Sequence, residues 1–97
     1  MIASFADGGT ADIFHGVSSR RAQASCPADL WPVARRKLDQ LNRVRAIADL
    51  RIPPGTRLES LRRDRAGQHS IRINAQYRVC FRWEAGHAHD VEIADYH

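Results

Sequence analysis

This sequence has no long apolar run and only two cysteines. None of its 97 residues belongs to an apolar stretch near the ~20 residues that a membrane-spanning helix needs, so we expect no membrane span. The opening MIASFADGG has no basic stretch followed by an apolar one, which argues against a secretory signal peptide. Two cysteines, Cys26 and Cys80, do not make a disulfide framework, so we expect reduced thiols and a cytoplasmic protein.

Motifs for metal or nucleotide chemistry are also missing. The sequence has no glycine-rich phosphate loop, no HExxH and no GxSxG. Its cysteines and histidines do not form a zinc-binding quartet. His87 and His89 have a spacing that would place two imidazoles on one strand face, but His87 falls in an expected turn. We therefore expect neither a metal nor a cofactor.

Positive charge is abundant and almost entirely arginine. There are 14 Arg and one Lys against 11 acidic residues. Between Arg57 and Arg82 lie seven Arg and two acids, a net charge of +5, while the rest of the chain has 8 basic and 9 acidic residues, a net −1. Arginine binds phosphate in a bidentate manner and stacks on bases. This segment predicts an anionic partner, although charge alone does not separate RNA, DNA and an acidic protein.

The last third of the chain, residues 67–97, has the period-2 alternation of β-strands. One buried face fixes the register between strands, because apolar residues must meet across the ladder. The predicted pairs are Ile73–Tyr77, Ile71–Val79, His69–Phe81 and Arg72–Arg78 in the first hairpin, and Phe81–Val91 and Val79–Ile93 in the second. Asp95 then lies beside Tyr77, and the arginine face and the C-terminal residues would converge at one end of the sheet. A bulge would shift this register by one residue.

The preceding residues predict a short strand followed by helices. Residues 1–6 form the strand, Thr10 caps a helix that runs to about Phe14, and residues 17–25 are expected to be a connection. Asp29 caps the main helix, whose apolar stripe is Trp31, Ala34, Leu38 and Leu41. A short helical turn follows, and the run 53–55 (PPG) ends the helical region.

This order predicts one α+β domain over residues 1–97. It has an N-terminal strand, two helices and then a mainly antiparallel sheet of about four strands. The helices would pack on one face of the sheet. The other face, with Arg72, Arg78 and Arg82, would remain free to bind a partner.

Polar residues that this fold would bring together are suited to cleaving RNA through its own 2′-hydroxyl. The set is Glu59, Arg62, Arg72, Arg78, Asp95, Tyr96 and His97. A histidine can take or give a proton, an arginine can stabilise a phosphate transition state, and a tyrosine can stack on a base. A terminal Asp-Tyr-His is more often a frayed end than an active site, so residue types alone leave both interpretations open.

Four segments occur in an order that is typical of one protein family: residues 50–61 (LRIPPGTRLESL), 64–74 (DRAGQHSIRIN), 76–81 (QYRVCF) and 91–97 (VEIADYH). Together they resemble the HigB plasmid-maintenance killer toxins of the RelE/ParE superfamily, over nearly the whole chain. The resemblance implies a RelE-like toxin of a type II toxin–antitoxin system that cleaves translated mRNA in the ribosomal A site without a metal. It also implies a HigA-type helix-turn-helix antitoxin as partner, and contact with operator DNA only through that antitoxin.

The resemblance further implies roles for single residues. Asp95, Tyr96 and His97 match the catalytic tail of these toxins, and Arg78 matches the arginine that holds the scissile phosphate. Arg62 matches a basic residue of the family's LKGD motif. We expect RNA binding by the arginines of the positive segment: Arg62, Arg63, Arg65, Arg72 and Arg82.

Two positions depart from the family pattern. Glu59 stands where some HigB toxins have a catalytic histidine, and could accept a proton or only pair with a nearby arginine. Arg63 replaces the usual glycine of LKGD. Two other functions stay open: a ParE-like toxin that inhibits DNA gyrase by binding and cuts nothing, and a non-enzymatic module that binds nucleic acid or an acidic partner.

Overall fold

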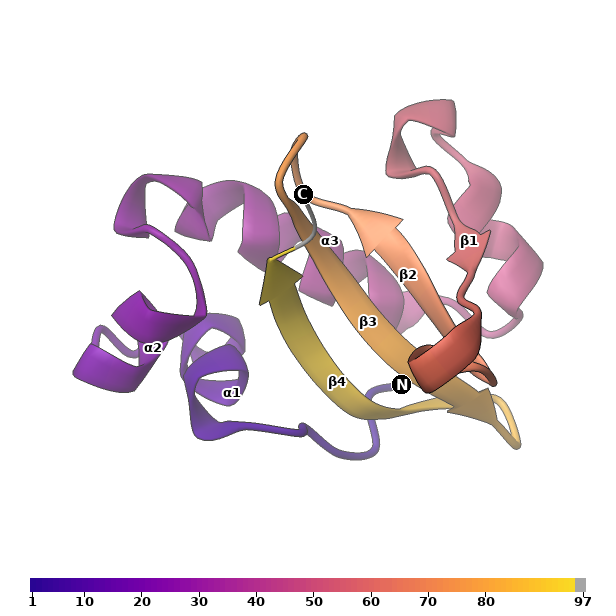
Figure 1. Ribbon diagram of the computed structural model, residues 1–97, viewed down its shortest axis with the longest axis horizontal. Helices are drawn as coiled ribbons and strands as arrows, with labels where there is room; N and C mark the ends of the chain where they lie inside the picture. The colour runs from indigo at the N-terminus through magenta and orange to yellow at the C-terminus, as the bar shows by residue number, and fades with distance from the viewer. Residues whose placement is uncertain (96–97) are drawn as a thin grey trace.

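The computed structural model describes residues 1–95, in which three helices precede a four-stranded antiparallel sheet (Figure 1). The helices are α1 (Gly8–His15), α2 (Arg20–Ser25) and α3 (Trp31–Arg43). The strands, in spatial order, are β1 (Glu59–Ser60), β2 (Gln68–Arg72), β3 (Tyr77–Glu84) and β4 (His87–Asp95). Short 3-10 helices lie between them: η1 (Ala28–Leu30), η2 (Ile47–Arg51), η3 (Pro54–Thr56) and η4 (Arg63–Arg65). The predicted α+β class is confirmed. Among the described residues, no helix has the length and apolar character to cross a membrane.

Helix α1 begins before the predicted cap. Asp7 is the N-cap and accepts a hydrogen bond from the backbone N–H of Thr10 at 2.7 Å, while Gly16, with φ 75°, ends the helix. The predicted cap, Thr10, is fully buried, and its hydroxyl oxygen accepts a hydrogen bond from the backbone N–H of Ile93 at 3.0 Å. Thr10 therefore ties α1 to β4 instead of capping a helix.

Helix α2 lies within the segment that was expected to be a connection, so that prediction is wrong. The helix has six residues and buries only Ala22, so its sequence has no apolar periodicity. Ser19 caps it, and Asp12 of α1 accepts hydrogen bonds from Ser19 Oγ and Arg21 Nε, each at 2.6 Å. Contacts with α1 therefore stabilise a helix that local sequence does not reveal.

The Asp12 cluster should make stability depend on acid pH. Its hydrogen bonds with Arg21 and Ser19 lower the pKa of Asp12 to about 2, from an ordinary value of 3.8. Because the pKa of Asp12 is lower in the folded protein than in the unfolded chain, its carboxylate stabilises the fold at pH values above about 3.8. This contribution is lost as the pH falls towards the folded-state pKa of about 2. We expect Asp12→Asn to lower the melting temperature at pH 7 but to match the wild type near pH 2, in thermal unfolding followed by circular dichroism. An Asn variant that is equally destabilised at both pH values would contradict this linkage.

The core lies between α3 and the sheet, which α3 crosses from behind in Figure 1. Ala34, Leu38 and Leu41 of the predicted stripe are fully buried, and Trp31 packs against them while its indole N–H donates to the carbonyl of Cys26 at 3.0 Å. The sheet contributes the buried residues Ile71, Val79, Phe81 and Val91. The predicted cap does not form: Asp29 lies in η1, and Leu30 precedes the helix.

Side chains of α3 also hold the loop that leads to β1. Lys37 Nζ donates to the hydroxyl of buried Thr56 at 3.0 Å, and Gln40 Nε2 donates to the carbonyl of Ile52 at 2.8 Å. Residues 37 and 40 are three apart, so they share one face of the helix. Burial lowers the pKa of Lys37.

The predicted N-terminal strand is reduced to two isolated parallel bridges with β4. Ile2 pairs with Ala88, and Phe5 with Val91. Residues at and next to these bridges make backbone hydrogen bonds along β4, including Ala6 N to Val91 O at 2.9 Å. The segment covers part of the β4 edge, a position that would otherwise expose unpaired backbone groups.

The register of the first hairpin is confirmed. Ile71 pairs with Val79, His69 with Phe81 and Arg72 with Arg78. In the second hairpin Val79 pairs with Ile93 as predicted, but the predicted Phe81–Val91 pair is absent, because the register shifts between Cys80 and Arg82. Asp90, with φ 52°, lies at this irregularity.

Candidate functional site

A row of polar side chains crosses the sheet on the face opposite the core. Cross-strand pairing joins Glu59 to Ser70, Ser70 to Cys80 and Cys80 to Glu92. Directly paired residues point to the same face, so these four side chains share it. Arg78 of β3 lies on the same face, two residues from Cys80.

The guanidinium of Arg78 is largely enclosed by its neighbours. Its Nε donates to Ser70 Oγ at 2.7 Å, and its Nη2 donates to the backbone carbonyl of Arg57 at 2.6 Å. Nη2 also lies 3.7 Å from a carboxylate oxygen of Glu59. The Arg78 side chain is 12% exposed, whereas that of Glu59 is 57% exposed. The structure thus brings together two residues of the predicted site, Glu59 and Arg78.

Two of the predicted RNA-binding arginines already have carboxylate partners. Arg65 Nη1 donates to Gln68 Oε1 at 3.0 Å and also to Glu92. Arg82 donates to Asp90 Oδ2 at 2.8 Å and to Glu84 Oε2 at 3.0 Å, and these hydrogen bonds raise its pKa. These pairs reduce the positive charge that either arginine offers to a ligand.

Arg62, Arg63 and Arg72 have no ion pair with another residue in the described range 1–95. Arg62 and Arg63 are exposed in and beside η4, and Arg72 is half-buried at the end of β2. In Figure 1, η4 lies in front of the sheet. Ser70 and Cys80, in the middle of this face, are fully buried. The sheet face that carries Arg72 and Arg78 was expected to be free to bind a partner. It is accessible only around its edges, because the segment from Arg57 to Arg65 covers part of it.

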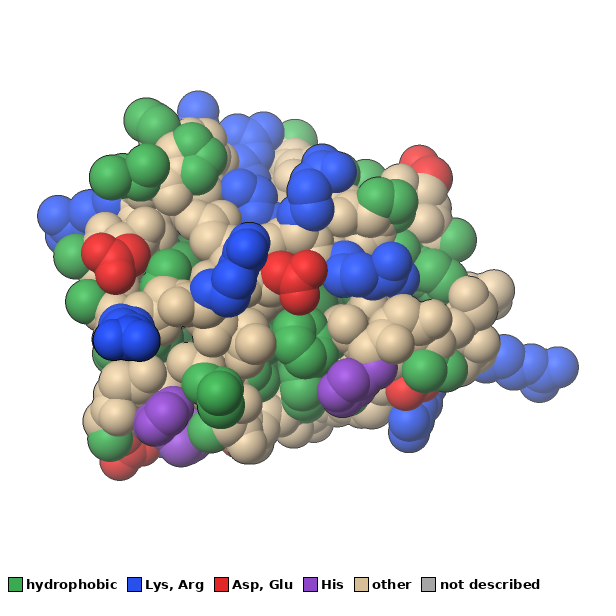
Figure 2. All heavy atoms as spheres, turned by 180° about the vertical axis from the view of Figure 1, so that it is seen from behind, with side chains coloured by type: hydrophobic (Ala, Val, Ile, Leu, Met, Phe, Trp, Pro, Cys, Tyr) green, Lys and Arg blue, Asp and Glu red, His purple; other side chains and the backbone are tan. Residues whose placement is uncertain are grey.

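Positive charge is less confined to the sheet than the sequence suggested. Residues 20–51 have eight basic and three acidic residues, a net charge of +5 that is offset by acidic residues nearer the two ends of the chain. Figure 2 shows the molecule from behind, with Lys and Arg side chains spread over that face. A second positive surface therefore lies on the helical side of the molecule.

Asp95 lies on the other face of the sheet from Arg78. It pairs with Tyr77, as predicted, and Gln76 Nε2 donates to its carboxylate at 3.0 Å. Neighbouring residues of a strand point to opposite faces, so Tyr77 and Asp95 point away from Arg78. The predicted convergence with the arginine face is thus not observed for Asp95. Tyr96 and His97, the other residues of the predicted catalytic tail, lie outside the described residues.

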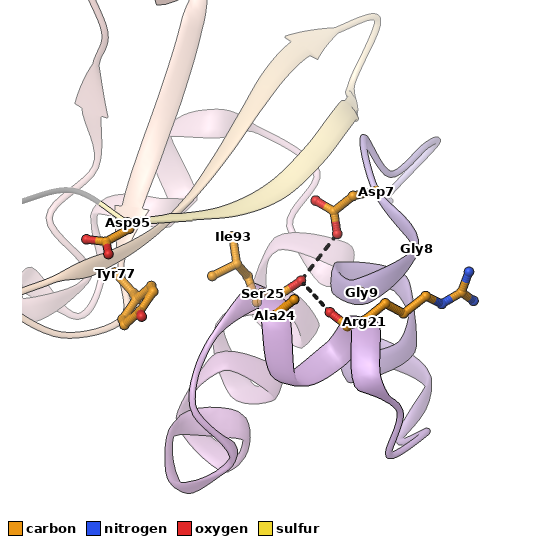
Figure 3. A pocket seen from close by; sticks show the side chains of 9 residues that line it. All are labelled: Asp7, Gly8, Gly9, Arg21, Ala24, Ser25, Tyr77, Ile93 and Asp95. Atoms are coloured by element: carbon orange, nitrogen blue, oxygen red, sulfur yellow. Dashed lines mark hydrogen bonds between the residues drawn. The ribbon is translucent and has the colours of Figure 1, made fainter.

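Asp95 instead lines a cavity of about 450 Å³ at the end of the sheet (Figure 3). The close-up shows Tyr77 and Asp95 on the strand side and Asp7, Gly9 and Ser25 on the helix side. Burial, and then the Asp95 carboxylate, raises the pKa of Tyr77. A neutral phenol with a raised pKa can donate a hydrogen bond but is a poor base at neutral pH.

Within residues 1–95, neither the thiols nor the two imidazoles of the β3–β4 hairpin form a reactive or metal-binding site. Cys26 and Cys80 are free and buried, and burial raises the pKa of Cys26 to about 11 and also that of Cys80. Neither is therefore a reactive thiolate at neutral pH. His87 and His89 lie near the β3–β4 turn, and within residues 1–95 no group of three or more metal-binding side chains is close enough to hold an ion.

Comparison with known proteins decides the family. The family model described as the RelE-like toxin HigB of type II toxin–antitoxin systems matches residues 4–97. The chain belongs to this HigB-like toxin family. It is 45% identical over 60 residues to Toxin HigB-1 of Vibrio cholerae, a match that covers 62% of this chain and 63% of the relative. It is 41% identical over 58 residues to an uncharacterized protein of Haemophilus influenzae, with 60% and 57% covered. Each match spans less than two thirds of the relative's length.

Sequence reasoning missed the two acceptors that hold Arg78. Ser70 was recognisable only as a small polar residue on the arginine face, a signal shared with many strand serines. The carbonyl of Arg57 gives no sequence signal at all. It reaches Arg78 because Arg57 adopts a left-handed conformation, with φ 49°, directly after η3.

The departure of this HigB-like chain from the glycine of the LKGD motif has a visible backbone consequence. Arg63 has φ 58°, a left-handed conformation that costs a non-glycine residue roughly 1–2 kcal/mol. Glycine avoids that strain but loses about 0.5–1 kcal/mol more backbone entropy on folding. We therefore expect Arg63→Gly to raise the free energy of unfolding by up to about 1 kcal/mol in urea denaturation.

The neighbouring arginine offers a matched control for this variant. Arg62 has φ −124°, an extended conformation in which glycine relieves nothing. Arg62→Gly changes the charge by the same amount, and it should destabilise the protein slightly. Equal effects of the two glycine substitutions would show that Arg63 is not strained.

Proposed function

We propose that this protein is the toxin of a type II toxin–antitoxin system and acts as a ribosome-dependent endoribonuclease on translated mRNA in the cytoplasm. The observation that carries the proposal is the enclosed guanidinium of Arg78, with Glu59 beside it, on the sheet face of a HigB-like chain. Its proposed partners are the ribosome with its mRNA and a HigA-type antitoxin. That antitoxin would mediate any contact with operator DNA.

The proposed reaction is attack of the RNA 2′-hydroxyl on the adjacent phosphorus. A base removes the 2′-hydroxyl proton, the new 2′-oxygen–phosphorus bond forms, and the bond to the 5′-oxygen breaks. An acid protonates that leaving oxygen, so the products are a 2′,3′-cyclic phosphate and a 5′-hydroxyl. This reaction needs charge stabilisation at the phosphate and two groups that move protons.

The residues are assigned to these tasks as follows. Arg78 binds the scissile phosphate and stabilises its transition-state charge. Glu59, an exposed carboxylate at 3.7 Å from Arg78, is suited to the base. His97 is the proposed acid, with Tyr96 as a stacking partner for a base of the RNA. Asp95, on the opposite face, would support the chain end and not contact the phosphate.

Arginines around the Arg78 site would bind the RNA backbone. Arg62, Arg63 and Arg72 surround the row and lack a carboxylate partner in the described part of the chain. Arg65 and Arg82 have such partners and would contribute less. Phosphate contacts of this kind fix orientation and make binding depend on salt concentration.

The test is controlled expression of the wild type and of His97→Ala, with mRNA 5′ ends mapped in both. We expect in-frame cuts in translated messages with the wild type only, and none in a message that lacks its start codon. Growth arrest without any cut would refute the nuclease and favour a toxin that acts by binding, such as a gyrase inhibitor. Cuts in both strains would keep the nuclease but move the acid role away from His97.

A further inference from the structure

The contacts of Arg78 leave one part of its guanidinium available. Of its five N–H groups, Nε–H points to Ser70 Oγ and one Nη2–H points to the carbonyl of Arg57. The remaining nitrogen, Nη1, makes no hydrogen bond to any residue of the described range 1–95. Side-chain freedom is small, because the Arg78 side chain is 12% exposed.

We propose that Ser70 and the carbonyl of Arg57 are positioning groups that fix the guanidinium of Arg78 so that its Nη1 edge meets the scissile phosphate. The inference rests on the proposed nuclease function. It goes beyond that function by naming residues that touch neither RNA nor the reacting atoms. It also commits to the edge of the guanidinium that binds the phosphate.

Ser70 is suited to this task because of where it lies. Ser70 of β2 is fully buried and pairs with Glu59 of β1 on one side and Cys80 of β3 on the other. The register of β2 with both neighbouring strands is regular at this point. The Ser70 hydroxyl accepts from Arg78 diagonally across the β2–β3 ladder, and a buried acceptor for a charged donor gives a short hydrogen bond, here 2.7 Å. The side chain of Arg78 is thus anchored to β2, whose pairing with β1 and β3 has no irregularity.

The carbonyl of Arg57 restrains the other end of the guanidinium of Arg78, at Nη2. It comes from the turn after η3, where Thr56 is buried and bonded to Lys37 of α3. Two acceptors from different parts of the fold, one on the sheet and one on this turn, define the plane of the guanidinium. A charged group held in place before the substrate arrives loses little further freedom in the transition state.

Glu59 is the third neighbour of the guanidinium, and it lies loosely beside Nη2. Its carboxylate is 57% exposed and 3.7 Å from Nη2, a distance at which the two charges attract without a hydrogen bond. An incoming phosphate can displace it from the guanidinium, and the displaced carboxylate stays near the RNA. The fixed partners of Arg78 are therefore the neutral ones, and the charged one is replaceable.

The test compares Ser70→Ala and Ser70→Cys with Ser60→Ala, an exposed strand serine whose hydroxyl lies 3.4 Å from His69 and not near Arg78. Ser70→Cys keeps the size of the side chain while replacing oxygen by a poor acceptor, so it guards against a packing defect in the alanine variant. Each protein is melted first to show that it is folded. Single-turnover cleavage of mRNA on programmed ribosomes then gives the rate and the half-saturating concentration separately.

We expect both Ser70 variants to lower the cleavage rate about tenfold or more, with the half-saturating concentration unchanged, and Ser60→Ala to match the wild type. In an Arg78→Ala background, Ser70→Ala should have no further effect, because the group that it positions is gone. In NMR spectra, the Nε–H signal of Arg78 should be sharp in the wild type and lost to solvent exchange in both Ser70 variants.

Failure of the inference and failure of the proposed function are distinguishable. A wild-type rate in both Ser70 variants, or a Ser70→Ala effect that persists without Arg78, would overturn the positioning role while the nuclease stands. A wild-type protein that cuts no mRNA would overturn the proposed function. The NMR signal would then decide whether Ser70 fixes the guanidinium, and an unchanged Nε–H signal in the Ser70 variants overturns the inference in every case.

Discussion

Arg78→Ala should abolish toxicity and lower the rate of mRNA cleavage by about 10²–10³-fold, the usual cost of removing one group that stabilises transition-state charge. The Arg78 side chain is less exposed than those of Arg65 and Arg82, and two neutral acceptors and one carboxylate lie around it. Its loss would remove the proposed phosphate contact and would leave Ser70 and the Arg57 carbonyl without their donor. The measurement is single-turnover cleavage on programmed ribosomes, together with growth after induction.

A matched control separates this effect from a general loss of positive charge. Arg36 is an exposed arginine of α3, on the opposite side of the core from the sheet face that carries Arg78. Arg36→Ala changes the net charge equally and should retain cleavage. Thermal melts must show that Arg78→Ala is folded. A folded Arg78→Ala protein that cuts at the wild-type rate would remove Arg78 from the site.

Gly9→Ala should lower the free energy of unfolding by about 3 kcal/mol, the upper end of the usual cost of overpacking. A Cβ atom at Gly9 would lie 2.2 Å from the carbonyl oxygen of Arg21 and 2.2 Å from Ser25 Oγ. The carbonyl is backbone, so α1 and α2 would have to separate. Alanine is intrinsically better than glycine in a helix by about 1 kcal/mol, which is too little to offset that displacement.

Separation of the two helices would also weaken neighbouring contacts. The Asp12–Arg21 ion pair joins α1 to α2. Thr10, whose hydroxyl accepts a hydrogen bond from Ile93, directly follows Gly9 in α1. Gly55→Ala is the control, because a Cβ atom there meets nothing within 4 Å. Urea denaturation should show a shift below about 0.5 kcal/mol for Gly55→Ala. Similar midpoints for the two variants would mean that α1 and α2 do not pack this closely.

Sequence patterns predicted the sheet better than the helices, for a physical reason. A strand with one buried face leaves a period-2 pattern, and that pattern placed Ile71 opposite Val79 and Arg72 opposite Arg78. Helix α2 buries one residue and is stabilised by Asp12 of another helix, so its own sequence contains little signal. The shift near Asp90 was also invisible, because a residue other than glycine adopts a positive φ there.

Sequence reasoning named two residues that the fold brings together, but it did not predict the contacts that surround them. Arg78 and Glu59 were both named from sequence, and they lie together. Alternation alone already placed Tyr77 and Arg78 on opposite faces. The predicted convergence of the C-terminal residues with the arginine face did not take this into account, since Asp95 pairs with Tyr77 and so lies on the face opposite Arg78. The backbone carbonyl that binds Arg78 comes from a left-handed residue, which sequence does not specify when the residue is arginine.

The attachment of the 52–57 loop to α3 has a consequence for how heat would act on the protein. Within the described residues, Lys37 and Gln40 make the side-chain hydrogen bonds from α3 to this loop, and most of the loop backbone is exposed. Segments with few buried contacts open with lower free energies than the core around them. The loop can therefore open while the sheet stays folded, and its opening withdraws the Arg57 carbonyl from Arg78. Warming would then reduce activity gradually and reversibly, at temperatures below the cooperative melting of the core.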